Sequence, residues 1–199
     1  MVFNFYGKGF NVNALMENHK VWQNAAALSA KAHRFHTRKD GVTPYISHPV
    51  RVCMTLVLVF EVLDPEILSA ALLHDVIEDT DTDFDDIHKA CGHEVASIVA
   101  ALSKDPRLQD KECKAMYRKQ LAGASWKVKI IKMADIYDNI CGLLVSRLGI
   151  NMWTPALHAI EDAIGVPELQ KASEILSGLL KAVESDKALL DGTKKAAKE

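Results

Sequence analysis

Apolar residues recur at helical spacing along most of this 199-residue chain, and the alternation of apolar and polar residues that marks a half-buried strand is nearly absent. The pattern predicts helices over residues 15–35, 50–62, 66–79, 84–91, 93–104, 111–122, 125–148 and 167–185. Segment 50–62 is rich in β-branched residues that a buried strand would also use, but its length and the helix start that follows it favour a helix. The predicted fold class is therefore all-α.

Helix boundaries are marked at several places in the chain. Asp64 suits an N-cap, Pro65 the first turn, and Glu66 the positive end of the helix dipole. A second start lies at residues 80–87, where acids again precede a helix, and Gly92 suits its C-terminal cap. The length fits one domain, which we expect over residues 1–185, with C-terminal helices over 155–185 and a flexible tail over 186–199.

Overall composition excludes several classes of protein. A formal charge of −2 argues against a general binder of nucleic acid polymers, which usually carries a strong basic excess. Four cysteines lie far apart with no CxxC pair, which favours free thiols in a reducing compartment. The longest apolar run, residues 52–60, is far shorter than the ~20 residues that span a bilayer. The N-terminal segment also lacks the apolar core of a signal peptide. We expect a cytoplasmic protein that does not enter a membrane.

Seven acidic residues crowd into positions 75–86, beside a histidine. A calcium-binding EF-hand loop starting at Asp79 fails, because Phe84 occupies its glycine position and Ala90 its final glutamate position. Helix capping accounts for the later acids, Asp83, Asp85 and Asp86. Capping does not account for the earlier group, which a continuous helix would gather within an arc of about 140° at its negative end. That group consists of His74, Asp75, Glu78 and Asp79. A divalent cation would neutralise it.

Two further ligand candidates lie elsewhere in the chain. His48 precedes Pro49, which fixes where a new helix begins. Asp135 lies on the apolar helix predicted over 125–148, in a polar stripe with Lys132, Asp138 or Asn139, and Gly142. A carboxylate on so apolar a helix must be paired with Lys132, bound to metal or protonated. The set His48, His74, Asp75 and Asp135 has the mixed nitrogen and oxygen donors of a catalytic Mn²⁺, Fe²⁺ or Zn²⁺ site.

Three segments carry a family resemblance: "AHRFHTRKDGVTPYISHP", "AALLHDVIEDT" and "VKIIKMADIYDNI". Together they resemble the HD superfamily of metal-dependent phosphohydrolases, a helical-bundle fold. More narrowly, they resemble the hydrolase domain of RelA/SpoT-type alarmone enzymes, and in size the small stand-alone hydrolases that include the metazoan SpoT homologue. The resemblance covers roughly residues 20–145.

The resemblance implies one divalent ion, most often Mn²⁺, held by His48, His74, Asp75 and Asp135. It implies that Glu78 and Asp79 orient and activate the nucleophilic water. It places Arg38 and Lys39 near the nucleotide and Asn139 at its ribose, and Lys132 is a further candidate for phosphate binding. The implied reaction removes the 3′-diphosphate of the small nucleotide ppGpp or pppGpp, releasing pyrophosphate and GDP or GTP.

Three residues depart from the family pattern: His36, Ile136 and Gly142. None is a candidate metal ligand, so we expect hydrolysis to survive, while the exact nucleotide stays open. One alternative is the same fold acting on ppApp, on the 2′-phosphate of NADPH or on a nucleoside monophosphate. Another is a degenerate module that only binds alarmones, although such a module need not retain Glu78 and Asp79. The sequence does not give the oligomeric state.

Overall fold

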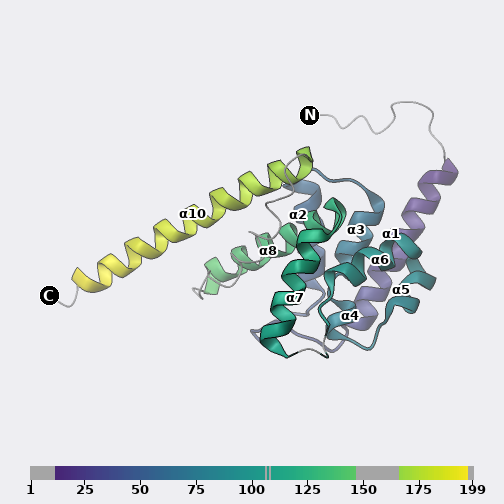
Figure 1. Ribbon diagram of the computed structural model, residues 1–199, viewed down its shortest axis with the longest axis horizontal. Helices are drawn as coiled ribbons and strands as arrows, with labels where there is room; N and C mark the ends of the chain where they lie inside the picture. Colours follow the sequence, from purple (N-terminus) through teal and green to yellow (C-terminus); the bar gives the residue numbers. More distant parts are fainter. Residues whose placement is uncertain (1–11, 106, 108, 147–165, 197–199) are drawn as a thin grey trace.

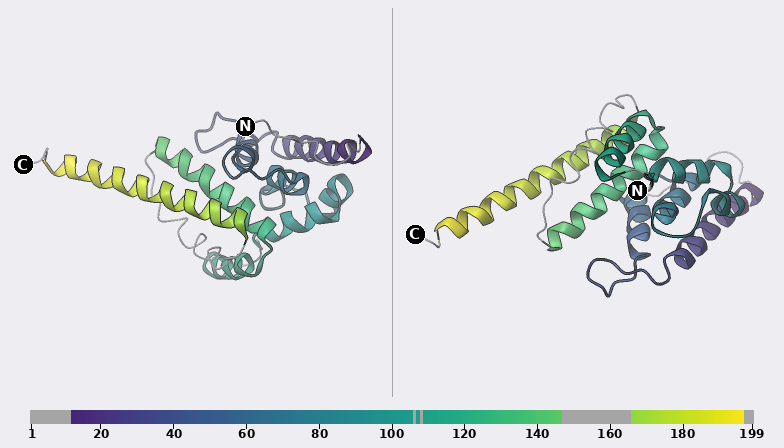
Figure 2. Two further views of the ribbon diagram at one scale, coloured as in Figure 1. Left: turned by 90° about the horizontal axis from the view of Figure 1, so that it is seen from above. Right: turned by 60° about the horizontal axis from the view of Figure 1, so that its bottom comes forward.

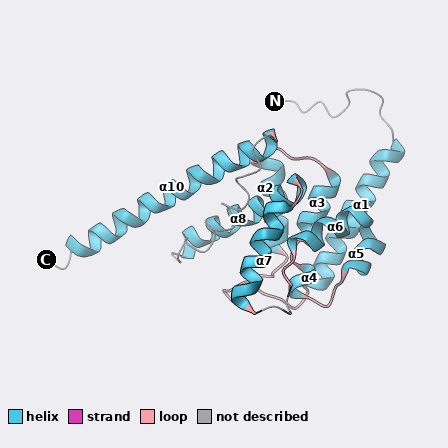
Figure 3. Ribbon diagram, viewed as in Figure 1, coloured by secondary structure: helices cyan, strands magenta, loops and turns pink. Residues whose placement is uncertain are grey.

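The computed structural model describes residues 12–105, 107, 109–146 and 166–196. Its helices are α1 (Val12–Ala32), α2 (Ser47–Leu58), α3 (Pro65–Leu73), α4 (Val76–Asp79), α5 (Phe84–Cys91), α6 (His93–Leu102), α7 (Asp110–Gly123), α8 (Trp126–Ser146) and α10 (Pro167–Ala196). The described part contains no strand beyond an isolated bridge between Thr37 and Pro44, as Figure 3 shows. The predicted all-α class is confirmed.

The helices pack as a bundle around one core (Figures 1 and 2). Helix α3 packs against α1, α2 and α6, while α8 packs against α2, α6 and α10. Fully buried side chains from different helices meet between these elements, among them Leu56, Ile67, Leu73, Ile131 and Ile136. Burying large aliphatic side chains in this way supplies most of the free energy that holds helices together. The segments that carry the candidate ligands are thereby fixed against one another.

The helix predicted over residues 66–79 is wrong as a continuous element. Helix α3 ends at Leu73, His74 and Asp75 form a turn, and α4 begins at Val76. The His74 Nδ1 donates a hydrogen bond to the Ala71 carbonyl at 2.8 Å, which in a continuous helix would accept from the Asp75 N–H. A side chain competing for a backbone acceptor is a local cause of helix interruption.

The expected caps are present. The Asp64 carboxylate accepts from the backbone N–H groups of Glu66 and Ile67 at 2.8 and 3.1 Å. Asp83 and Asp86 form a reciprocal capping box at the start of α5. Gly92 ends α5 with φ of +91°, a conformation that residues with a side chain rarely adopt. These acids of the crowded segment therefore serve the helix start.

Most helix ends differ from the prediction by a few residues, and the differences at α2 and α10 matter most. Helix α2 begins at Ser47 instead of residue 50, which brings His48 into its first turn. Helix α10 runs to Ala196 and extends away from the bundle in Figures 1 and 2, so residues 186–196, expected in a flexible tail, are helical. Residues 155–165 of the predicted C-terminal helices lie outside the described residues, as do 1–11 and 197–199. Within the described residues, no helix combines the length and apolarity needed to span a membrane.

Candidate metal centre

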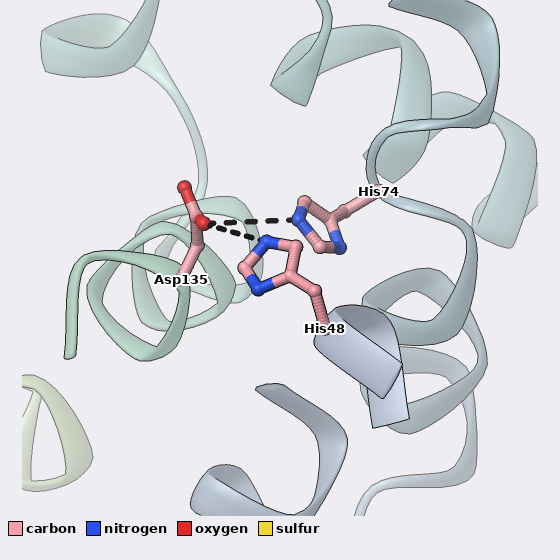
Figure 4. A group of neighbouring side chains, drawn as sticks. All are labelled: His48, His74 and Asp135. Carbon is pink, nitrogen blue, oxygen red and sulfur yellow. Dashed lines mark ion pairs between the residues drawn. The ribbon is translucent and has the colours of Figure 1, made fainter. Parts of the chain in front are cut away.

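Three buried side chains from three helical segments converge on one point, as Figure 4 shows. His48 comes from the first turn of α2, His74 from the end of α3, and Asp135 from the middle of α8. One donor atom of each lies within 4.8 Å of the others. The Asp135 Oδ1 is 3.1 Å from the His48 Nε2 and 3.8 Å from the His74 Nε2.

The fourth predicted ligand, Asp75, lies beside these three. Its Oδ2 is 3.1 Å from the His74 Nε2 and 3.6 Å from the His48 Nε2. The turn between α3 and α4 therefore brings two consecutive residues to the same point, although they are about 100° apart on a helix. All four residues that the sequence selected are gathered in one place.

The Nδ1 of each histidine, on the side of the ring away from the shared point, forms a hydrogen bond with the protein. The His48 Nδ1 bonds to the Asp138 carboxylate at 2.7 Å, and the His74 Nδ1 to the Ala71 carbonyl at 2.8 Å. In the neutral tautomer with its proton on Nδ1, each imidazole would direct its Nε2 lone pair at the shared point, as a metal ligand must. The His74 Nε2 is buried and forms no hydrogen bond of good geometry with the described residues. Buried polar atoms are nearly always satisfied, so an orphaned nitrogen among carboxylates fits a metal ligand.

Burial and neighbouring charges shift the pKa values of His74 and Asp135 in opposite directions. Burial lowers the pKa of His74, but the Asp75 and Asp135 carboxylates outweigh it and raise that pKa to about 9. Burial likewise raises the pKa of Asp135, yet Lys132 and then the two histidines hold it well below its usual value. The raised pKa of His74 thus reflects the two carboxylates that its imidazole faces. A divalent cation compensates the same carboxylates with its own charge.

The remaining oxygen positions of Asp135 are occupied by its neighbours on α8. The Lys132 Nζ lies 2.7 Å from Oδ2, and the Asn139 Nδ2 donates to Oδ1 at 2.6 Å. The ammonium of Lys132 also lies over the Tyr117 ring, 5.6 Å from its centroid. The predicted phosphate ligand Lys132 therefore forms an ion pair with a predicted metal ligand.

Two of the predicted nucleotide-binding residues, Arg38 and Asn139, are linked to the centre by hydrogen bonds. Arg38 donates from Nη2 to the Asn139 Oδ1 at 3.3 Å, which links it to the Asp135 neighbourhood. Arg38 and the exposed Lys39 lie on the loop between α1 and α2. Hydrogen bonds from the Arg38 N to the Thr43 O and from the Tyr45 N to the His36 O close this loop at 2.8 and 2.9 Å.

Glu78 and Asp79, the two acids expected to orient and activate the nucleophilic water, differ in their surroundings. The Glu78 carboxylate pairs with the Lys104 ammonium at 2.7 Å. Asp79 lies nearer the centre, where its carboxylate interacts with the Tyr45 hydroxyl. The pKa of Asp79 is raised, first by partial removal of its carboxylate from water and then by the negative charge of Asp75. A carboxylate with a raised pKa is a better proton acceptor.

Sequence reasoning assigned no role to Tyr45 and Asp138, which contact candidate ligands, or to Arg51, which contacts Asp138. The Tyr45 hydroxyl donates to the Asp75 Oδ2 at 2.7 Å, and Asp138 holds both His48 and Arg51. Spacing carried a signal for two of them, since Asp138 follows Asp135, and Arg51 follows His48, by one helical turn. Tyr45 had no such signal, because a loop has no fixed periodicity.

The three departures from the family pattern lie in different environments. The His36 Nδ1 is 3.3 Å from the Nδ1 of His33, a buried residue whose ring lies 4.6 Å from the Tyr45 ring, tilted by 30°. Ile136 is fully buried in the hydrophobic core. A Cβ added at Gly142 would meet no described atom within 4 Å, so this glycine borders open space.

Comparison with known proteins agrees with this geometry. The model of a family described as "HD domain" matches residues 25–141. A guanosine-3′,5′-bis(diphosphate) 3′-pyrophosphohydrolase of Drosophila melanogaster is 39% identical over 119 residues, which cover 59% of this chain and 66% of the relative. The Homo sapiens protein of the same name is 38% identical over 156 residues, covering 78% of this chain and 82% of the relative.

A solved structure is also similar to this chain. Its published description reads "A metazoan ortholog of SpoT hydrolyzes ppGpp and plays a role in starvation responses". The superposition has a TM-score of 0.69 at 28% sequence identity and covers 79% of this chain and 94% of the other.

Proposed function

This chain belongs to the HD-domain family, and from that premise we propose that it is a metal-dependent phosphohydrolase. Its reaction removes the 3′-diphosphate of guanosine 3′,5′-bis(diphosphate), releasing pyrophosphate and GDP, or GTP from the pentaphosphate. The convergence of two imidazole Nε2 atoms and two carboxylates on one buried point carries the proposal. The activity named for the fly and human relatives supports the choice of substrate.

The chain would hold one divalent ion through His48, His74, Asp75 and Asp135. Mixed imidazole and carboxylate donors suit Mn²⁺, with Fe²⁺ and Zn²⁺ as alternatives. Such an ion, when bound, polarises a phosphoryl oxygen and lowers the pKa of water. Lys132 and Asn139 keep Asp135 ionised and oriented toward the histidines.

The acids beside this set handle the proton of the attacking water. Asp79 is the better placed acceptor in the metal-free protein, because its pKa is raised and it lies beside Asp75 and Tyr45. Glu78, the adjacent residue of α4, would orient the same water, and its carboxylate is itself held by the Lys104 ammonium at 2.7 Å. A positioned carboxylate of this kind contributes typically 10²–10⁴-fold to a proton-transfer step.

The basic residues of the α1–α2 loop would compensate the negative charge of the substrate. The planar guanidinium of Arg38 either stacks on a base or forks onto phosphate, whereas the Lys39 ammonium acts as a mobile point charge. We expect Asn139, which is hydrogen-bonded to Arg38, to contact the ribose. The compensation of an anionic substrate is therefore local and compatible with a net charge of −2.

One observation favours a second candidate, the same hydrolysis on another nucleotide. Gly142 lies one turn beyond Asn139, and a Cβ added there would meet no described atom within 4 Å. A site without a side chain at this position sets fewer limits on the base. We therefore keep ppApp, the 2′-phosphate of NADPH and nucleoside monophosphates as alternative substrates.

The decisive experiment incubates purified protein and Mn²⁺ with ppGpp, ppApp, NADPH and nucleoside monophosphates. We expect pyrophosphate and GDP from ppGpp, with activity lost on chelation and restored by Mn²⁺. Asp85→Asn, an exposed acid in the first turn of α5, is the matched charge control and should retain full activity. Phosphate release from another nucleotide would support the second candidate instead. Inactivity on every substrate despite bound metal would contradict both and favour a module that only binds.

Two further expectations belong to this proposal. The four cysteines are free thiols in the structure, which agrees with a reducing compartment, and we propose the cytoplasm. We also propose that residues 1–185 act as one domain on a small nucleotide, without a nucleic acid polymer as partner.

A further inference from the structure

Asp138 occupies an unusual position for a charged residue. It lies on α8 one turn after Asp135, and its side chain is only 6% exposed. Its Oδ2 accepts from the His48 Nδ1 at 2.7 Å and from the Arg51 Nη2 at 3.0 Å, while its Oδ1 accepts from the Arg51 Nε at 2.7 Å. Both oxygens are thus engaged, by one imidazole and one guanidinium fork.

We propose that Asp138 and Arg51 are positioning residues that prepare His48 to bind metal. This inference rests on the proposed function, because it assumes that His48 is a ligand. Asp138 keeps the proton of the neutral imidazole on Nδ1, and Arg51 keeps Asp138 in place.

The physical reason lies in the two tautomers of histidine. A neutral imidazole carries one proton, and only the nitrogen without it can donate a lone pair to a metal. A carboxylate 2.7 Å from Nδ1 favours the tautomer with the proton there, which frees the Nε2 that faces Asp135 and Asp75. The same bond fixes the rotation of the ring. Carboxylates behind metal-binding histidines typically increase metal affinity by 10–100-fold.

Arg51 is needed because the Asp138 carboxylate is buried on an apolar helix face. An ionised carboxylate removed from water is costly unless it is paired and hydrogen-bonded. The Arg51 fork meets both oxygens, which fixes the orientation of the carboxylate better than a point charge would. The Arg51 side chain is itself 47% exposed, so its guanidinium remains in contact with water.

The contact also joins two helices, and this suggests a simpler role to be tested against the proposal. His48 and Arg51 lie one turn apart on α2, and Asp138 lies on α8, so the group ties these helices together. A purely structural tie would lower the stability of the metal-free protein when it is removed. It would leave the metal affinity of the folded protein unchanged.

The experiment measures the Mn²⁺ dissociation constant by calorimetry for wild type, Asp138→Ala, Asp138→Asn and Arg51→Ala. We expect Asp138→Ala to weaken binding roughly 10–100-fold. Asp138→Asn, which retains an oxygen acceptor, and Arg51→Ala, which retains the carboxylate, should lie between it and wild type. Glu66→Gln is the matched control: it removes an ion pair between α3 and Lys127 of α8, remote from the centre, and should leave the dissociation constant unchanged.

A second readout follows the tautomer itself. In zinc-loaded protein with ¹⁵N-labelled histidine, wild type should show a His48 Nδ1–H in a strong hydrogen bond, and Asp138→Asn should weaken that signal. If Asp138→Ala fails to fold, the isosteric Asp138→Asn carries both measurements.

The outcomes separate the two proposals. If Asp138→Asn and every folded Asp138 variant bind Mn²⁺ within twofold of wild type while their metal-free melting temperature falls, the group is only a structural tie and this inference is overturned. If wild type itself fails to bind a divalent ion, the proposed function fails and this inference fails with it.

Discussion

At the scale of single residues, the side chains of the centre are already held in place by hydrogen bonds to neighbouring residues. The Nδ1 atoms of His48 and His74 are bonded, and Asp135 is held by Lys132 and Asn139. What remains pointing inward are two Nε2 atoms and carboxylate oxygens. Such preorganisation reduces the cost of ordering the ligands when an ion binds.

Replacing Asp135 and replacing Glu78 should have different effects. Asp135→Asn removes a ligand and leaves the Lys132 ammonium, 12% exposed, without its buried counter-ion. We expect loss of metal and activity, and a fall of about 3–5 kcal/mol in the unfolding free energy of the metal-free protein. Glu78→Gln should keep the metal and lose turnover by roughly 10²–10⁴-fold. Metal content, urea denaturation and initial rates measure these effects, and normal hydrolysis by Asp135→Asn would contradict the site.

Metal uptake should release protons in a pH-dependent manner. The pKa of His74 in the metal-free protein is about 9, above its ordinary 6.5, so its imidazole holds a proton at pH 7. The stability that this charge contributes is complete below pH 6.5 and is lost as the pH rises through about 9. A ligand must be deprotonated, so Mn²⁺ binding should release more protons at pH 7 than at pH 9.5. Calorimetry in buffers of different ionisation enthalpy measures this number, and equal release at both values would contradict the prediction.

At the scale of helices, the acidic segment divides into two parts with different roles. The turn after α3 carries His74 and Asp75 into the centre, whereas Asp83 and Asp86 close the first turn of α5. The negative charges of Asp75 and of the capping acids are therefore compensated by different partners. Imidazoles face the first part, and backbone N–H groups face the second.

The capping role of Asp83 can be measured separately from the metal centre. Asp83→Ala removes the acceptor for the Asp86 N–H and one side of the capping box, so it should cost about 1 kcal/mol of stability. Asp85→Ala, which removes the same charge from the exposed first turn, is the control and should cost less. Urea denaturation measures both. A changed Mn²⁺ affinity in Asp83→Ala would mean that the division between cap and metal centre is wrong.

At the scale of the whole molecule, the site depends on how α8 is held. Helix α8, which carries Asp135 and Asp138, packs against α2 and α6 and also against α10. The described buried residues of α10 all lie in the part that ends at Val183: Leu169, Ala172, Leu176 and Val183. Beyond them α10 continues away from the bundle in Figure 1.

The first half of α10 should therefore contribute to global stability. Leu176 is fully buried, and Leu176→Ala should cost roughly 2–5 kcal/mol. Glu174→Ala, an exposed position on the same helix, should change stability by less than about 0.5 kcal/mol. Thermal denaturation of the metal-free protein measures the difference. If Leu176→Ala left stability unchanged, the packing of α10 on α8 would not hold the fold.

Much of this architecture could be predicted because its causes are local. Helix periodicity and the caps at Asp64, Asp83 and Gly92 depend on residues within a few positions of one another. The break at His74 could not be predicted, because apolar periodicity continues through it, and the imidazole bond to the Ala71 carbonyl leaves no pattern in the sequence. The candidate ligands were selected by residue type and context, and their roles as ligands stay a prediction.

Local patterns in the sequence predict the all-α class, the helix boundaries near strong caps and the four residues expected to lie together. Which atoms face one another depends on tertiary packing: the Nε2 atoms of His48 and His74 face the carboxylates, Tyr45 bonds to Asp75, and Arg51 bonds to Asp138, which holds the Nδ1 of His48. The two kinds of information depend on interactions of different range along the chain. Helix propensity and capping act over a few residues, whereas these polar contacts join helices separated by up to 90 positions and depend on how the buried apolar faces pack.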